Sequence, residues 1–201
     1  MKEQGKYRPL SYFQLMEVSL RELLVEKGLL TEAQINRQVE DMRGRTPERG
    51  AKVVARAWVD AGFKERLLSN GTKACEELGL DVPALKLVVV ENTPEVHNVI
   101  VCTLCSCYPR NLLGIPPDWY KSRAYRSRMV REPRAVLEEF GTSIPLKIQV
   151  RVHDSTADMR YLVLPMRPAG TEGWPEERLA ALVTRDSMIG VSAPKSPGQS
   201  S

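Results

Sequence analysis

Apolar side chains recur at helical spacing through the first eighty residues. One stripe runs from Phe13 to Leu24, begins at the capping-box pair Ser11 and Gln14, and meets a helix-ending glycine at Gly28. The same reasoning predicts three further helices, which begin at Thr31, at Thr46-Pro47 and at Gly62, the last ending at Gly79. The first part of the chain is therefore predicted to be helical.

Beyond Asp81 the pattern changes to short runs rich in Val, Ile and Leu. Residues 85–91, 98–101 and 147–152 have the composition or alternation of strands. Strands are also predicted over 159–164 and 188–191, completing one sheet, and helices over 122–131, 133–140 and 175–183. Pro109, Pro116 and Pro117 are expected to keep the segment before residue 122 irregular. The predicted fold class is α+β.

The length of 201 residues suits one full domain with an appendage. Hydrophobic residues at 42% and charged residues at 27% are ordinary for a globular protein. We expect a helical N-terminal arm over residues 1–80, a mixed helix and strand domain over 81–194 and a disordered tail over 195–201. No apolar run is long enough to cross a bilayer, and Met1–Arg8 lead into no signal-peptide core. A cytoplasmic protein without membrane association is expected.

The net charge of +4 is unevenly distributed along the chain. Residues 108–134 contain seven basic and two acidic side chains, so this stretch alone carries +5. Nucleic-acid binding is one interpretation, but no zinc-finger, helix-turn-helix or regular aromatic pattern accompanies the charge. We therefore expect no nucleic-acid partner and interpret the stretch as a solvated helix face or a subunit interface.

Three of the four cysteines, Cys102, Cys105 and Cys107, fall within six residues, which we name the cysteine loop (residues 102–107). A tight cluster in a chain without a signal peptide indicates a metal site or redox chemistry. A structural zinc site or an iron–sulfur cluster lacks a well-spaced fourth ligand. A thioredoxin-type pair would leave Cys107 unexplained, and three inert thiols are the remaining alternative.

Bond counting permits one further arrangement. The sulfurs of Cys105 and Cys107 and the deprotonated amide nitrogens of Ser106 and Cys107 form chelate rings of about five or six atoms around one metal. Cys102 would then supply an axial thiolate and leave a sixth position open. Such donors suit low-spin trivalent iron or cobalt better than zinc. The spacing permits this site without establishing it.

The segment Val101–Cys107 resembles the metal-binding signature of nitrile hydratase alpha subunits. The resemblance extends over most of the chain and is carried by further segments: Val88–Pro94, Leu113–Ser122, Val130–Arg134, Arg160–Pro165, Arg167–Trp174 and Val183–Asp186. The metal-bearing subunit of thiocyanate hydrolase is a close relative of this family. Arg110 and Asn111 depart from the Trp and Pro that nitrile hydratases commonly have there, and Arg110 is closer to thiocyanate hydrolase.

This resemblance implies a fold with a helical N-terminal arm and a layered α/β/β/α catalytic domain. It also implies one cobalt(III) per chain, or alternatively iron(III), held by Cys102, Cys105, Ser106 and Cys107. Cys105 would become a sulfinic acid and Cys107 a sulfenic acid, and Thr103, where iron members tend to have Ser, favours cobalt. The residues expected around these ligands are Thr103, Arg110, Asp154, Asp158 and Arg160.

The reaction implied is hydration of a small nitrile to its amide, with the metal as Lewis acid and Cys105, Ser106 and Cys107 as the catalytic residues. The Cys107 sulfenate would be the nucleophile or the general base. Oxidised sulfurs need cationic donors, which the family takes from a beta-type subunit that is sometimes split into two chains. An activator or metallochaperone would load the cobalt. A thiocyanate hydrolase subunit is the alternative function, and a non-catalytic metal-binding or redox module is a third.

Overall fold

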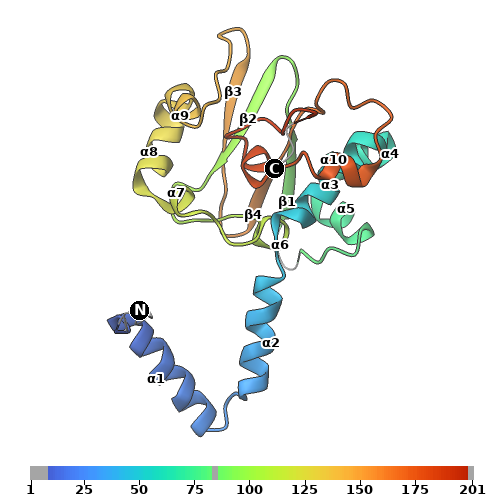
Figure 1. Ribbon diagram of the computed structural model, residues 1–201. Helices are drawn as coiled ribbons and strands as arrows, with labels where there is room; N and C mark the ends of the chain where they lie inside the picture. The colour runs from blue at the N-terminus through green and yellow to red at the C-terminus, as the bar shows by residue number, and fades with distance from the viewer. Residues whose placement is uncertain (1–8, 83–85, 199–201) are drawn as a thin grey trace, which may run out of the picture. The chain divides into compact units, whose positions relative to one another are not determined.

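The structure is a computed structural model of the chain and describes residues 9–82 and 86–198. The chain separates into two compact units, Met1–Gly44 and Arg45–Ser201 (Figure 1). All strands of the described residues lie in the larger unit. Within the described residues, no helix is long and apolar enough to span a membrane.

The described part of the smaller unit consists of α1 (Tyr12–Glu26) and α2 (Glu32–Arg43). Both helices begin at the capping boxes that the sequence predicts. An ion pair between Arg21 and Glu32 joins them. Neither helix contains a buried residue, so these two helices form no hydrophobic core of their own.

The larger unit begins with α3 (Pro47–Val59), α4 (Ala61–Ser69) and α5 (Gly71–Glu77). The single helix predicted from Gly62 to Gly79 is wrong, because the chain leaves helical geometry at Asn70, whose φ is −150° and ψ 90°. The Asn70 side chain accepts a hydrogen bond from the backbone N–H of Lys73 and so begins α5.

The helices after residue 44 belong to the larger unit by their contacts. Helix α3 has six buried residues and packs on α4, α6 (Arg110–Leu113) and α10 (Glu176–Ala180). The compact units therefore divide at residues 44 and 45, whereas the sequence places the end of its helical arm at residue 80. Of the predicted tail, residues 199–201 lie outside the described residues, and the backbone N–H of Lys195 donates to the Leu182 carbonyl.

The strands form two parallel pairs instead of one sheet. Strand β1 (Lys86–Glu91) pairs with β4 (Met159–Leu164), with Lys86 opposite Met159. Strand β2 (Val96–Val101) pairs with β3 (Gln149–Asp154), with Val101 opposite Asp154. Each pair joins segments that lie far apart in the sequence, with one pair nested inside the other.

The strand predicted over 188–191 is wrong. Met188 and Ile189 form the end of a helix, α11 (Arg185–Ile189), and Gly190 caps it. Thr184 and Ser187 form a capping box at its start. Gly190 ends it with φ +92°, and a Cβ there would lie 2.1 Å from the Asn98 carbonyl oxygen. Only glycine fits this close approach of α11 to β2.

The elements of the larger unit stack in layers, as expected for the α/β/β/α fold. Helices α4 and α5 contact β1, strand β2 contacts β1 and β4, and α9 (Pro133–Glu139) contacts β3. Figure 1 shows α7 (Asp118–Lys121), α8 (Arg123–Arg131) and α9 beside the β2–β3 pair. The prediction that prolines keep the segment before residue 122 irregular is wrong, because Pro109 and Pro117 directly precede the short helices α6 and α7. The predicted α+β class is confirmed.

Candidate metal centre

Strand β2 leads the chain from the core into the cysteine loop. Its last residues, Val99–Val101, are fully buried, and so is Cys102. The chain then reaches the surface, where Leu104 is 85% exposed and Cys105 is exposed. Cys107 is half-buried, so the loop returns toward the core at its end.

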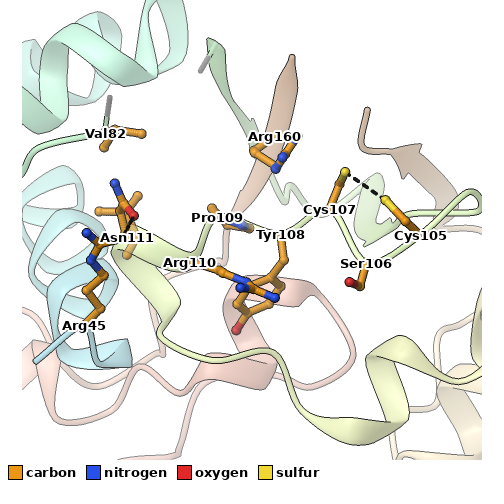
Figure 2. Close-up of a pocket in the computed structure, with 11 residues that line it drawn as sticks. Arg45, Val82, Cys105, Ser106, Cys107, Tyr108, Pro109, Arg110, Asn111 and Arg160 are labelled. Carbon is orange, nitrogen blue, oxygen red and sulfur yellow. Dashed lines mark hydrogen bonds between the residues drawn. The ribbon is translucent and has the colours of Figure 1, made fainter. Parts of the chain in front are cut away.

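The three sulfurs of the loop form one cluster. The Sγ atom of Cys105 lies 3.2 Å from that of Cys107 (Figure 2). It lies 3.5 Å from that of Cys102, and all three sulfurs lie within 4.8 Å of one another. The backbone N–H of Cys105 donates to Cys102 Sγ at 3.3 Å. The backbone N–H groups of Ser106 and Cys107 also lie close enough to the Cys105 sulfur to lower the pKa of its thiol. The five donor groups considered from spacing alone thus lie together.

Asp154 holds the first turn of the loop through two hydrogen bonds. The backbone N–H of Thr103 donates to Asp154 Oδ1 at 2.9 Å, and its hydroxyl donates to Oδ2 at 2.6 Å. Asp154 can reach Thr103 because it ends β3 directly opposite Val101, which ends β2. The carboxyl ends of two parallel strands therefore meet at the cysteine loop.

Two side chains from the region after the loop hold its backbone from other directions. The Tyr120 hydroxyl donates to the Cys107 carbonyl at 2.9 Å, and Arg126 Nη1 donates to the Thr103 carbonyl at 3.3 Å. Neither residue is among those predicted from the sequence. The segment that resembles the family includes Tyr120, and the basic stretch includes Arg126, but nothing in their spacing indicates these contacts.

The surroundings of Cys105 and Cys107 shift the pKa values of their thiols in opposite directions. Hydrogen bonds from the Cys107 and Cys102 thiols, and then from the Ser106 and Cys107 amides, lower the pKa of Cys105 to about 7. Burial and the hydrogen bond to Cys105 raise the pKa of Cys107 to about 12, while the nearby Arg160 guanidinium opposes this rise. In the metal-free chain, Cys105 is therefore the first of the two to become a thiolate.

A cavity of about 360 Å³ opens beside the sulfurs (Figure 2). Cys105, Ser106 and Cys107 line one side of it, and Arg45 and Asn111 lie on the other, joined by a 2.8 Å hydrogen bond. Its remaining lining residues are Val82, Tyr108, Pro109, Arg110, Leu112 and Arg160. The cavity is large enough for a small molecule beside the sulfur cluster.

The structure brings most of the predicted surrounding residues to this site. Thr103 and Asp154 bind each other at the loop, and Arg110 and Arg160 line the cavity. Arg160 donates to the Ala157 carbonyl at 2.9 Å, and its buried Nε has no hydrogen-bond partner among the described residues. Asp158 does not lie at this site, because it is exposed and does not line the cavity. Its backbone carbonyl accepts a hydrogen bond from the Lys86 amide.

The donor set of the loop fits the trivalent metals considered above. Thiolates together with amide nitrogens are soft, strong-field donors, and no described carboxylate or imidazole completes a zinc-type or calcium-type set with the three sulfurs. The unpartnered Arg160 Nε beside Cys107 provides a donor for an oxygen on that sulfur. The arrangement can therefore hold one metal ion with an open side toward the cavity.

Comparison with known proteins identifies similar chains. The family model described as "Nitrile hydratase, alpha chain" matches residues 11–192. The cobalt-containing nitrile hydratase subunit alpha of Pseudonocardia thermophila is 54% identical over 180 residues, 88% of each chain. Thiocyanate hydrolase subunit gamma of Thiobacillus thioparus is 43% identical over 201 residues, which are 94% of this chain and 82% of that one.

Among solved structures, a double mutant of the Fe-type nitrile hydratase from Comamonas testosteroni Ni1 superposes with a TM-score of 0.88. It is 47% identical, and the alignment covers 94% of each chain. The similarity thus extends over both the helical and the layered parts of the fold.

Proposed function

The chain belongs to the nitrile hydratase alpha-chain family, and on that premise we propose that it is the metal-bearing alpha subunit of a nitrile hydratase. Its reaction is the addition of water to a nitrile, R–C≡N, to give the amide. The observation that carries this proposal is the cluster of three sulfurs within 4.8 Å at the edge of a small cavity.

The proposed metal is cobalt, which the names of several relatives contain. Cys102, Cys105 and Cys107 would hold it through sulfur, and Ser106 and Cys107 through their amide nitrogens. When bound, cobalt supplies Lewis acidity that draws electron density from the nitrile carbon. The chain's own groups then orient the substrate in the cavity and handle the proton of the attacking water.

Cys105 and Cys107 are proposed to carry oxygen, as a sulfinic and a sulfenic acid. The Cys107 sulfenate oxygen would attack the nitrile carbon or accept the proton of the attacking water. Arg160 would stabilise the negative charge of that oxygen, since its guanidinium lies beside Cys107 and its Nε has no other partner among the described residues. Asp154 would keep the loop in register by holding Thr103.

A beta-type partner subunit is part of this proposal. Arg110 and Arg160 are the guanidiniums that this chain places at the cavity next to the sulfurs, together with Arg45 on the far side. Two oxidised sulfurs expose several acceptor oxygens, and further donors would come from the partner. We also propose that an activator loads the cobalt, that the substrate is a small nitrile and that the protein is cytoplasmic.

The test is an assay of the complete complex, loaded with cobalt, on propionitrile and on thiocyanate, with metal analysis and mass spectrometry of the cysteine peptide. We expect nitrile turnover, one cobalt per chain and a mass increase of about 48 Da from three added oxygens. An active complex with three unmodified thiols, or with zinc instead of cobalt, would contradict the proposed centre.

The Cys107→Ser variant tests the catalytic role of the sulfur. Serine removes both a metal ligand and the sulfenate oxygen, so we expect nitrile turnover to fall below detection while the complex still assembles. Cys75→Ser is the matched control, because Cys75 is buried in α5 away from the cysteine loop. Normal turnover in a verified Cys107→Ser complex would exclude this mechanism.

Thiocyanate hydrolysis is the second candidate function, and Arg110 is the observation that favours it. Its side chain lines the cavity, and the 43% identical relative is a thiocyanate hydrolase subunit. We expect Arg110→Trp to retain cobalt and to change the ratio of thiocyanate to nitrile turnover, because it replaces a charge in the cavity wall with an aromatic ring. Unchanged rates on both substrates would mean that Arg110 does not contact the substrate.

A further inference from the structure

A groove of about 500 Å³ runs along α8, next to the cysteine loop. Three arginines line it, Arg123, Arg126 and Arg131, together with Thr103, Ser127 and Val130. These three arginines belong to the basic stretch noted in the sequence, and the proposed reaction does not use them.

The arginines of this groove lack the ion pairs that Arg128, on the same helix, forms. Arg128 donates to Glu132 at 2.5 Å and to Glu139 at 2.6 Å, so its charge is balanced within the chain. Within residues 9–82 and 86–198, no carboxylate forms an ion pair with Arg123, Arg126 or Arg131. Three like charges in one groove repel one another unless an acidic group from elsewhere joins them.

The groove is also continuous with the cysteine loop. Arg126 donates to the Thr103 carbonyl at 3.3 Å, and its buried Nε has no hydrogen-bond partner among the described residues. Val130, in the groove, is 51% exposed, and Leu104, next to Thr103, is 85% exposed. An apolar rim beside arginines without ion pairs is typical of a protein interface. A surface for single-stranded nucleic acid would offer aromatic side chains for stacking.

We propose that this groove docks an acidic segment of the beta-type partner subunit, and this inference rests on the proposed function. Aspartate or glutamate side chains of the partner would pair with Arg123, Arg126 and Arg131, and an apolar partner residue would cover Val130 and Leu104. Docking here would place the partner directly over the cysteine loop, because Thr103 belongs to both the groove and the loop.

The experiment measures the dissociation constant of this chain from its beta-type partner at low and high salt. We expect Arg123→Glu with Arg131→Glu to raise the dissociation constant by about tenfold or more at low salt, and Arg123→Gln with Arg131→Gln to raise it by a smaller factor. The control is Lys52→Glu with Lys73→Glu, which changes the net charge equally at exposed positions of α3 and α5. Thermal unfolding of each variant checks that its fold is retained.

The outcomes separate this inference from the proposed function. At saturating partner, the double Gln variant should keep wild-type nitrile turnover, because neither residue contacts the cysteine loop. A dissociation constant that follows the control would overturn the groove as a docking site. So would retention of a short DNA duplex by the wild-type complex at this groove, since that would assign it to nucleic acid. Failure of the wild-type complex to hydrate nitriles would instead refute the proposed function, and the inference with it.

Discussion

At the residue scale, the cysteine loop depends on groups that come from three other parts of the chain. Asp154 binds two atoms of Thr103, Tyr120 binds the Cys107 carbonyl and Arg126 binds the Thr103 carbonyl. Each contact leaves the sulfurs themselves free to bind a metal. These side chains therefore hold the loop without using any of its sulfurs.

Replacing Asp154 by Ala removes both acceptors of Thr103. We expect the free energy of unfolding of the metal-free chain to fall by about 1 kcal/mol, since the site is partly open to water, and the cobalt content per chain to fall with it. Urea unfolding and metal analysis measure the two effects. Asp158→Ala is the control, because Asp158 is exposed and outside the cavity lining, and should change stability by less than about 0.5 kcal/mol. Equal effects of the two substitutions would remove Asp154 from the site.

The cysteines of the site could be predicted from the sequence, whereas two residues that hold the loop could not. Spacing alone groups Cys102, Cys105 and Cys107, because metal ligands on one short loop must be close in sequence. Tyr120 and Arg126 escape detection because their contacts go to backbone carbonyls, which every residue has. The metal ligands and catalytic residues stay predictions.

At the element scale, two histidine hydrogen bonds hold the β2–β3 pair together and join it to α11. His97 of β2 donates from Nε2 to the Gly190 carbonyl at the end of α11, at 2.7 Å. His153 of β3 donates to the Asn98 side chain at 2.8 Å. Protonation of either imidazole would bury a positive charge, which is costly. The stability of these two contacts therefore depends on pH.

Stability should therefore fall as pH is lowered through about 6.5. Burial lowers the pKa of His97, opposed by the Gly190 carbonyl and aided by Arg134, and burial and Arg151 lower the pKa of His153. The unfolded chain, with ordinary pKa values near 6.5, binds more protons below that pH than the folded chain does. We expect a loss of at most about 1.4 kcal/mol per pH unit for each histidine until the folded-state pKa is reached.

Urea unfolding between about pH 5.5 and 7.5 measures this slope. The His97→Gln and His153→Gln double variant keeps an N–H donor at each position and should show a much flatter profile. A slope equal to that of the wild-type chain would show that other groups control the acid response.

Two of the wrong predictions, the single helix over 62–79 and the strand over 188–191, share one cause. Local hydrogen bonds of polar side chains decide where helices begin, and they override a continuous apolar pattern. Asn70 begins a new helix in the middle of the stripe from Gly62 to Gly79, and Thr184 begins a helix ahead of the apolar run 188–191. The longer stripes, which have clear caps at both ends, were predicted correctly.

At the scale of the whole molecule, the smaller unit exposes many apolar side chains. Helices α1 and α2 contain no buried residue, yet large apolar side chains are exposed on them and on the turn between them, including Phe13 at 81%, Leu20 at 57% and Leu29 at 66%. Exposed apolar surface of this extent is typical of a protein interface. The membership of the chain in an alpha-chain family makes a beta-type subunit the expected occupant.

We expect Phe13→Ser with Leu20→Ser to weaken binding of the partner by about tenfold or more, because burial of two large apolar side chains drives association. The melting temperature of the larger unit should not change. The matched control replaces Glu17 and Glu22, exposed polar residues of the same helix, by Ser. Titration of each variant with the partner, followed by light scattering, measures the effect; equal affinity of both variants would exclude α1 from the interface.

The nested strand pairs also govern the order of events during synthesis. The cysteine loop follows β2, but the strands that carry Asp154 and Arg160 are translated about fifty residues later and pair with β2 and β1 only then. On the ribosome the three thiols therefore emerge into solvent before the strands that position them, and pairings of such large sequence separation form slowly. A nascent chain halted before β4 would present thiols without Arg160 at the cavity. We therefore expect cobalt to be delivered to the folded chain, by a factor that recognises the finished fold and not the emerging loop.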